Sequence, residues 1–434
     1  MRRGAPPLAL AAVALAAGCH AASRAGRSPA PAPVPVGAQP VVRVGIVVDR
    51  DSAAVSASGQ FRLVDQSGGA IAVSDAGRSW TVRAGEAGRL LLYREGREEP
   101  LNLPAPVVLA PERAGDDVLI GARRYRGDAL LLRGSVGVTV VNRAPLELYL
   151  QSVVALELGF RAPTDREAVM AQAVAARTYA VRYRGRREAL GFDVFATDAD
   201  QVYGGVPAEF PEVTDAVQRT VGQILTWQGQ PIQALFHSTC GYSTEAAEEV
   251  FQNRESVPYL RATSDRFGGG DRDFYCGLSP KFRWREEWDA DGLSAILART
   301  LPAVLGRGGN GGSATSGAAA DIGRVTDIRA ARLTGGGRVA ELVVTTTTGT
   351  FTVNHGRVRD VLRPAADRQL LSTLFQLHVE KDGERLVRVV ASGAGFGHGV
   401  GMCQFGAVGR ARAGQDYRRI LATYYHGTTL ERIY

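Results

Sequence analysis

Cysteine, lysine and long apolar runs are all scarce in this 434-residue chain. No two of the four cysteines form a CxxC pair, which argues against a zinc site built on closely spaced cysteines. Beyond the N-terminus, no apolar run is long enough to cross a membrane. Lys281 and Lys381 are the only lysines, so arginine carries almost all of the positive charge.

The charge balance is basic, with a formal net charge of +7. A basic protein can bind nucleic acid, but the sequence has no basic cluster interleaved with aromatic residues and no nucleic-acid-binding motif. We therefore expect anionic wall polymers or lipid headgroups as partners, and no nucleic acid.

Residues 1–19 have the pattern of an export signal. Arg2 and Arg3 precede a short apolar run, and small residues then lead to Cys19. This ending resembles a bacterial lipobox, so we expect Cys19 to be lipidated and the protein to be a membrane-anchored lipoprotein facing the periplasm or cell wall. The alternative is secretion with loss of Cys19. Residues 20–41, rich in Ala and Pro, predict a disordered tether.

The rest of the chain predicts an α+β fold. Between residues 42 and 144, short alternating or apolar runs are separated by Gly, Asp and Ser clusters, which is the pattern of strands and hairpins. Residues 145–434 show helical patterns followed by further strands. The Gly/Ser/Ala-rich stretch 307–320 cannot build a core and predicts a flexible insertion.

A helix is expected from Pro145, which suits a first helical position, to Gly159, which suits a helix end. Its apolar stripe comprises Leu146, Tyr149, Leu150 and Val153. Four residues further on, the stripe reaches Glu157. Burial and the negative end of the helix dipole both disfavour a charged carboxylate, so Glu157 is a candidate general acid with a raised pKa. The alternative is a solvated glutamate at a helix end; Glu147, in the first turn, we interpret as structural.

A second helix is expected to begin with a capping box formed by Thr164 and Glu167. Its body is rich in alanine, but Gln172, Arg177 and Thr178 interrupt the apolar run. Buried polar groups need partners. These side chains either satisfy loop carbonyls or face water, or they line a substrate-binding cleft near Glu157.

Long motifs follow one another along the chain: LELYLQSVVALELG with EAVMAQAVAARTYA, then DADQVYGG, HSTCGYSTE, PYLR, SPKFRW and GFGHGVGMCQFGA. Together they resemble the SpoIID/LytB family, which groups sporulation stage II protein D with amidase enhancers. The match runs from about Val42 to the C-terminus. It implies a SpoIID domain with residues 42–144 as its β-rich part and 145–434 as its catalytic core.

The resemblance implies lytic transglycosylation of peptidoglycan, in which the 6-hydroxyl of N-acetylmuramic acid attacks and leaves a 1,6-anhydro end. The catalytic acid of the family falls on Glu157. One carboxylate is enough because the nucleophile is internal; other carboxylates near motifs are Asp198, Asp200 and Glu245. Some family members instead enhance a cell-wall amidase, so a non-catalytic glycan-binding protein with an amidase partner is the alternative.

The motif at residues 198–205 predicts a turn-rich loop. Gln201 and Tyr203 are candidates for hydrogen bonding and stacking with sugar, with packing of the loop as the alternative. Some relatives carry cysteines near this loop, which suggests a local metal site. The corresponding region of this chain offers no such ligands, so we expect that site to be absent.

Glycine occupies every second position from Gly393 to Gly401. In an extended segment these glycines would share one face, leaving bare backbone against which a ligand or another strand could lie. His398 and Gln404 are candidates for sugar contacts, together with His237 and Ser238 of the HSTC motif. The alternative for His398 is a histidine whose hydrogen bonds are satisfied within the fold.

The cysteines at 240, 276 and 403 have three conceivable states. Two of them could form a disulfide in an exported protein, all three could be free buried thiols, or they could bind a structural zinc with His237. No other cofactor is expected. A nucleophile formed by Cys240 or Cys403 with a nearby histidine is a further alternative, but neither has a recognisable protease context.

Overall fold

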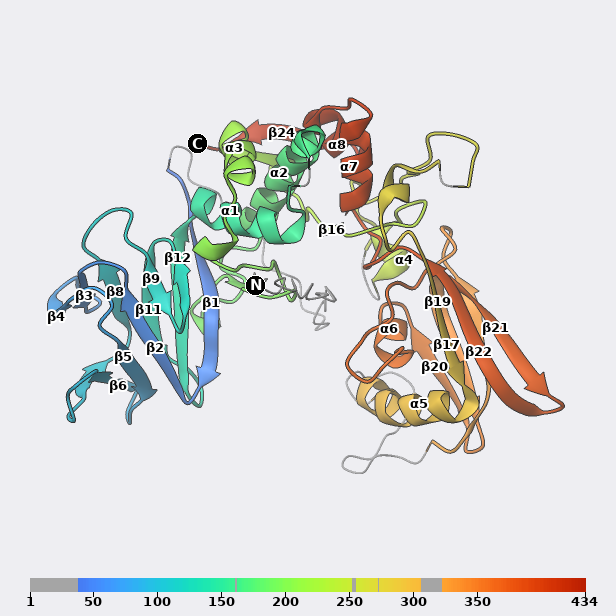
Figure 1. The fold of residues 1–434 in the computed structure, drawn as a ribbon, viewed down its shortest axis with the longest axis horizontal. Coiled ribbons are helices and arrows are strands. Elements are labelled where there is room, and N and C mark those ends of the chain that lie inside the picture. Colours follow the sequence, from blue (N-terminus) through green and yellow to red (C-terminus); the bar gives the residue numbers. More distant parts are fainter. Residues whose placement is uncertain (1–37, 161, 252–254, 272, 306–321) are drawn as a thin grey trace, which may run out of the picture.

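A computed structural model describes residues 38–160, 162–251, 255–271, 273–305 and 322–434 (Figure 1). Helices and mainly antiparallel sheets are mixed along the chain, which confirms the predicted α+β class. The export signal with Cys19, the tether up to residue 37 and the insertion at 307–320 lie outside the described residues. Within the described residues, no helix combines the length and apolarity needed to cross a membrane.

Two sheets make up the N-terminal part. Their strand orders are β13-β1-β12-β11-β8-β3-β4 and β10-β9-β2-β5-β6-β7. The strands are β1 Val41–Arg50, β2 Ser52–Ala57, β3 Phe61–Val64, β4 Ala70–Ser74, β5 Trp80–Ala84, β6 Arg89–Arg94, β7 Leu101–Pro104, β8 Val107–Pro111, β9 Val118–Ile120, β10 Arg123–Tyr125, β11 Asp128–Arg133, β12 Val138–Pro145 and β13 Val194–Phe195. Because β12 pairs along β1 and continues directly into the first helix, the sheet fixes where that helix starts.

A layer of helices lies beside these sheets. It contains α1 Leu146–Glu157, α2 Arg166–Arg182, α3 Pro211–Arg219, α7 Gln404–Arg412 and α8 Tyr417–Tyr424. The alanines of α2 let its neighbours approach closely, and the helix is buried from Ala168 to Val181. The C-terminal helices α7 and α8, red in Figure 1, return to pack beside α2, in green. The last part of the chain therefore completes a first hydrophobic core, which the N-terminal strands and these helices share.

Small elements connect the helices. One sheet has the order β15-β14-β24, with β14 Gln223–Trp227, β15 Gln230–Pro231 and β24 Thr429–Arg432. A parallel pair, β16 Phe236–His237 and β23 Met402–Cys403, places His237 opposite Cys403. The short helices are η1 Pro163–Asp165, η2 Glu188–Leu190, η3 Val206–Ala208, α4 Ala247–Val250 and η4 Tyr275–Leu278.

A second hydrophobic core, separate from the first, is formed by residues between 288 and 391. Its elements are β17 Arg283–Asp289, α5 Ala290–Leu305, β18 Val325–Leu333, β19 Val339–Thr346, β20 Thr350–Asn354, α6 Arg357–Val361, β21 Phe375–Asp382 and β22 Arg385–Ala394. They form the yellow-to-orange lobe of Figure 1, with sheets ordered β17-β22-β21 and β18-β19-β20. The sequence analysis treated residues 145–434 as one catalytic core, and the second hydrophobic core lies within that range.

Two helix starts differ from the prediction. Pro145 is the N-cap of α1 rather than its first residue. The capping box was wrong: η1 precedes α2, and no side chain caps that helix. Glu167 instead accepts a hydrogen bond from the backbone N–H of Tyr417 at 2.8 Å. A tertiary contact with the start of α8 has replaced the local bond.

The alternating glycines do not form an extended ribbon. From Gly395 to Gly401 every second residue has a positive φ, between 71° and 105°, a conformation that favours glycine. A Cβ atom on Gly401 would lie 2.0 Å from the carbonyl oxygen of Leu235, and one on Gly395 would lie 2.5 Å from that of Thr239. The expected extended ribbon with a bare face is therefore wrong. Carbonyl groups of neighbouring backbone lie against Gly395 and Gly401, so the close approach at these two positions is by protein and not by a ligand.

Candidate active site

Glu157 lies in the last turn of α1, as predicted; it is the last residue of the helix, and its side chain is partly buried. The preceding stripe of Leu146, Tyr149, Leu150 and Val153 is fully buried, so the helix cannot rotate Glu157 into bulk water. Glu157 Oε1 accepts a hydrogen bond from the backbone N–H of Val202 at 3.0 Å. The carboxyl group is thereby fixed against the loop 198–205.

The surroundings of Glu157 raise its pKa from 4.5 to about 7. Burial is the main cause, because an ionised carboxylate loses hydration there, and the negative charge of Asp198 adds to the shift. Hydrogen bonds from Val202 and from the Gln404 side chain lower the pKa and only partly offset burial. Near neutral pH the group can therefore both give and take a proton.

Gln404, the first residue of α7, joins Glu157 to α2. Besides its bond to the Glu157 carboxylate, its Nε2 donates to Oε1 of Gln172 at 3.5 Å. The two glutamines are buried, and Nε2 of Gln172 has no hydrogen-bond partner within the described residues. The structure thus brings the predicted residues Glu157, Gln172 and Gln404 together from three helices, and leaves one buried donor that a ligand could satisfy.

Arg177 serves a different purpose from the predicted substrate contact. Its fully buried guanidinium pairs with Glu147 at 2.7 Å and also donates to the carbonyl oxygen of Gln223 at 3.1 Å. Thr178 likewise bonds backbone groups, accepting from the N–H of Leu225 at 2.9 Å. Arg177 and Thr178 therefore hold α2 to its neighbours, and Glu147 has the structural role expected of it.

Gln201 and Tyr203 point into the protein and are buried. Gln201 Oε1 accepts from the hydroxyl of Tyr149 at 3.1 Å, while the Tyr203 hydroxyl donates to Asn142 Oδ1 at 2.9 Å. These contacts match the packing alternative rather than stacking on sugar. Anchored in this way, the loop presents the N–H of Val202 to Glu157.

The histidines lie close to each other, with ring centroids 5.4 Å apart. Nδ1 of His237 is 3.2 Å from the carbonyl oxygen of Val400, and the N–H of Val400 donates to Nδ1 of His398 at 3.0 Å. Burial lowers the pKa of His398 well below its ordinary value. Ser238, partly buried, contacts the Thr239 hydroxyl at 3.3 Å. These bonds match the alternative that His398 is satisfied within the fold, whereas Nε2 of the buried His237 has no hydrogen-bond partner within the described residues.

Two of the three other candidate carboxylates are engaged elsewhere. Asp200 pairs with Arg187 at 2.8 Å, and Glu245 accepts from the hydroxyl of Thr334 at 2.5 Å. Asp198 alone of the three acts on the pKa of Glu157. The site therefore centres on one carboxylate with a raised pKa.

The three cysteines predicted to be a disulfide, free thiols or metal ligands lie together as free buried thiols, and Asp265 joins them. Sequence reasoning missed Asp265, because no motif marks it and its fold position alone brings it to the sulfurs. It also missed Val202, whose backbone N–H could not be placed before the loop was known.

Two family models match separate parts of the chain. Residues 135–227, which include Glu157, match "SpoIID: Stage II sporulation protein". Residues 267–401 match "Domain of unknown function (DUF8618)" and contain the second hydrophobic core.

Relatives extend the similarity over most of the chain. A protein of Brachyspira hyodysenteriae described as uncharacterized is 31% identical over 317 residues, covering 73% of this chain and 74% of the relative. Stage II sporulation protein D of Bacillus subtilis is 30% identical over 305 residues, covering 67% of this chain and 75% of the relative. The amidase enhancer of B. subtilis is 31% identical over 292 residues, but this chain spans only 38% of that protein. This chain belongs to the SpoIID family.

Proposed function

We propose that this protein is a peptidoglycan lytic transglycosylase that cleaves the β-1,4 bond between N-acetylmuramic acid and N-acetylglucosamine. The observation that carries the proposal is the Glu157 carboxyl, which is partly buried, held by Val202 and Gln404, and has a pKa raised to about 7. Such a group is protonated often enough near neutral pH to act as a general acid, and its conjugate base is strong enough to take a proton back.

The proposed reaction needs no water and no second carboxylate. Glu157 donates its proton to the bridging oxygen as the bond from that oxygen to C1 of N-acetylmuramic acid breaks. The 6-hydroxyl of the same sugar then bonds to C1 and gives its proton to the Glu157 carboxylate. The products are a 1,6-anhydro end and a free N-acetylglucosamine 4-hydroxyl, and Glu157 regains its starting state.

Val202 and Gln404 have a role in this cycle. Between the two proton transfers Glu157 is ionised, and hydrogen bonds from the Val202 N–H and the Gln404 amide stabilise the carboxylate. Its pKa stays raised all the same, so the carboxylate can take up a proton again. Gln172 lies next to this pair, and its Nε2 is a buried donor without a hydrogen-bond partner within the described residues.

A second candidate function is a glycan-binding protein that enhances a cell-wall amidase. It is favoured by the relative named amidase enhancer, although this chain spans only 38% of that protein. In this alternative Glu157 would bind glycan without transferring a proton, and the partner would be the amidase.

One experiment separates the two functions. The purified protein is incubated with peptidoglycan, either intact or stripped of stem peptides, and soluble products are analysed by mass spectrometry. Anhydro-muropeptides or anhydro-sugars from the wild type but not from Glu157→Gln support the transglycosylase. Glu212→Gln, which alters an exposed glutamate of α3, is the matched control. Binding without any anhydro product, combined with faster hydrolysis by an added amidase, would support the enhancer instead.

The cellular location is part of the proposal. Lipidation of Cys19 would tether the protein to the membrane on the side where the wall lies, so that the SpoIID domain meets glycan strands. Metabolic labelling with a radioactive fatty acid tests this: label should enter the wild type and be absent from Cys19→Ser. An unlabelled wild type recovered from the medium would indicate secretion.

A further inference from the structure

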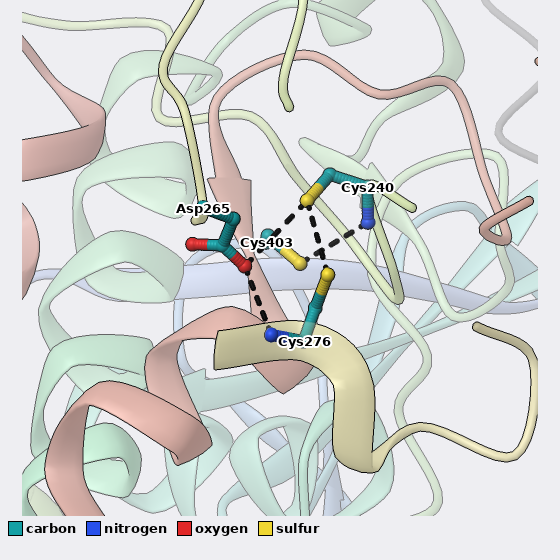
Figure 2. Close-up of side chains that lie close together, drawn as sticks. All are labelled: Cys240, Asp265, Cys276 and Cys403. Atoms are coloured by element: carbon teal, nitrogen blue, oxygen red, sulfur yellow. Dashed lines mark hydrogen bonds between the residues drawn. The ribbon is translucent and has the colours of Figure 1, made fainter. Parts of the chain in front are cut away.

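Three thiols and one carboxylate meet in the first core, and we call Cys240, Cys276, Cys403 and Asp265 the cysteine cluster (Figure 2). One ligand atom from each residue lies within 4.8 Å of all the others, and all four side chains are buried. The residues come from separate segments: Cys276 from η4, Cys403 from β23 at the start of α7, and the other two from loops.

The separations suit a tetrahedral metal ion. With bonds of about 2.3 Å to sulfur and 2.1 Å to oxygen, a zinc tetrahedron places two sulfurs about 3.8 Å apart and sulfur and oxygen about 3.6 Å apart. The Sγ atoms of Cys240 and Cys276 are 3.4 Å apart, and Cys240 Sγ lies 3.6 Å from Asp265 Oδ2. Small movements of the sulfurs would complete the site.

The carboxylate of Asp265 is oriented for this purpose. Its Oδ1 accepts from the hydroxyl of Tyr424 at 2.6 Å and from Arg410 at 3.1 Å, which leaves Oδ2 facing the sulfurs, with a bond from the Cys276 N–H at 3.1 Å. Outer contacts of this kind hold metal ligands in place. A Cβ on Gly406 would lie 2.4 Å from Oδ2, so the glycine makes room for the carboxylate.

The sulfur of Cys403 is also in a setting that suits a thiolate. It accepts backbone N–H groups from Cys240 at 3.1 Å and from Gly406 at 3.3 Å, the latter at the N-terminus of α7. Such donors stabilise negative charge on sulfur. His237 is not part of the four-residue group; its Nδ1 faces the Val400 carbonyl, and its side chain also lies beside Cys403.

A disulfide accounts for less of this arrangement than a cation does. Closing Cys240 onto Cys276 would use two sulfurs and leave Cys403 and the buried Asp265 facing a neutral bridge. Four acidic groups placed together away from water are stabilised when a cation binds between them. We propose that Cys240, Cys276, Cys403 and Asp265 bind one Zn²⁺ in a closed, four-ligand structural site.

The zinc site bears on the candidate active site through chain connectivity. Cys403 immediately precedes Gln404, which contacts Glu157 and Gln172. Zinc bound to Cys403 fixes the N-terminus of α7 and therefore positions Gln404. The ion itself has no free coordination position and takes no part in the chemistry.

The first test uses the wild-type full chain and does not depend on enzymatic activity. Purified without chelators, the protein should contain one equivalent of zinc, measured by inductively coupled plasma mass spectrometry. After exchange with Co²⁺ it should show the strong near-ultraviolet absorption of thiolate-to-cobalt charge transfer. A Cys240–Cys276 disulfide in peptide mapping, or no stoichiometric zinc in protein folded with zinc supplied, would overturn the proposal.

Variants then test the ligand set. Cys276→Ser and Asp265→Asn should each weaken zinc binding by more than about tenfold, and chelation should lower the Tm of the wild type by roughly 10 °C. His378→Ala, which changes an exposed histidine of β21, should keep its zinc. Glu157→Gln should keep it as well, so failure of the zinc proposal and failure of the proposed enzyme are distinguishable.

If a ligand variant does not fold, the cobalt spectrum of the wild type still decides, because its charge-transfer absorption requires thiolate ligands. Unchanged zinc affinity in folded Asp265→Asn would remove Asp265 from the site.

Discussion

Helix α1 carries a glutamate near each end, and the protein gives the two groups opposite surroundings. Glu147, in the first turn, pairs with the buried Arg177 at 2.7 Å and accepts the N–H of Gly222 at 3.2 Å. Glu157, the last residue, has no cation beside it in the described structure; burial and Asp198 raise its pKa to about 7. The same residue type is therefore structural at one end and suited to proton transfer at the other.

The largest expected difference between the two ends is in catalysis. Glu157→Gln should lower the rate of anhydro-product formation by roughly 10³-fold, because general acid–base groups contribute about 10²–10⁴-fold. Glu147→Gln, assayed well below its Tm, should lose less than about tenfold, since Glu147 lies at the opposite end of the helix. Rates are measured by mass spectrometry of released products. Equal losses in both variants would contradict the division of roles.

The next effect is on stability, and it should fall on the other glutamate. Glu147→Gln leaves the fully buried Arg177 without its ion-pair partner, which should cost about 3 kcal/mol and lower the Tm by roughly 10 °C. The exposed-site variant Glu212→Gln should unfold like the wild type. Thermal unfolding followed by circular dichroism makes the comparison. A Glu147→Gln protein as stable as the wild type would show that this ion pair is not needed.

Replacing Glu157 should raise the stability of the protein, whereas replacing Glu147 should lower it. The gain should appear only at neutral or higher pH. Because its folded-state pKa is raised from 4.5 to about 7, the folded protein binds more protons than the unfolded chain between these values. Stability contributed by the neutral carboxyl is full below pH 4.5 and is lost as the pH rises through 7. Removing the ionisable group should therefore stabilise the protein at about pH 8 by about 3 kcal/mol, with little effect at about pH 4.

The measurement for this prediction is the Tm of wild type and Glu157→Gln at both pH values. The variant should melt several degrees above the wild type at the higher pH and together with it at the lower pH. A variant that is less stable at the higher pH would mean that the fold stabilises ionised Glu157, which is the reverse of a pKa raised by burial.

The smallest predicted effect concerns Gln404. The activity measured as kcat/KM should fall as the pH rises above about 7, because Glu157 must be protonated to act as an acid. Gln404→Ala removes a hydrogen bond that lowers this pKa, so the midpoint should move to higher pH by less than about one unit. Gln415→Ala, a glutamine after α7 that bonds Tyr275, serves as the control. A midpoint that moves to lower pH would contradict the assigned role of Gln404.

The contrast between the two glutamates was largely readable from the sequence, since helical spacing and the dipole are local properties. The stripe from Leu146 to Val153 located Glu157, and the first-turn position identified Glu147 as structural. The hydrogen-bond and ion-pair partners of the site residues could not be predicted from the sequence. Arg177, Val202 and Asp265 meet their neighbours only through long-range packing, and the glycines from 395 to 401 looked extended because alternation does not reveal the sign of φ.

Protonation of Glu157 near neutral pH is the central claim, and carbon-13 NMR of the glutamate carboxyl groups measures it directly. Spectra of protein labelled at the glutamate side-chain carboxyl are recorded across a pH series, and the resonance missing from Glu157→Gln is assigned to Glu157. We predict that this resonance titrates with a midpoint at about 7. A midpoint near 4.5, the ordinary value for glutamate, would contradict the claim, because Glu157 would then be ionised at neutral pH and have no proton to donate.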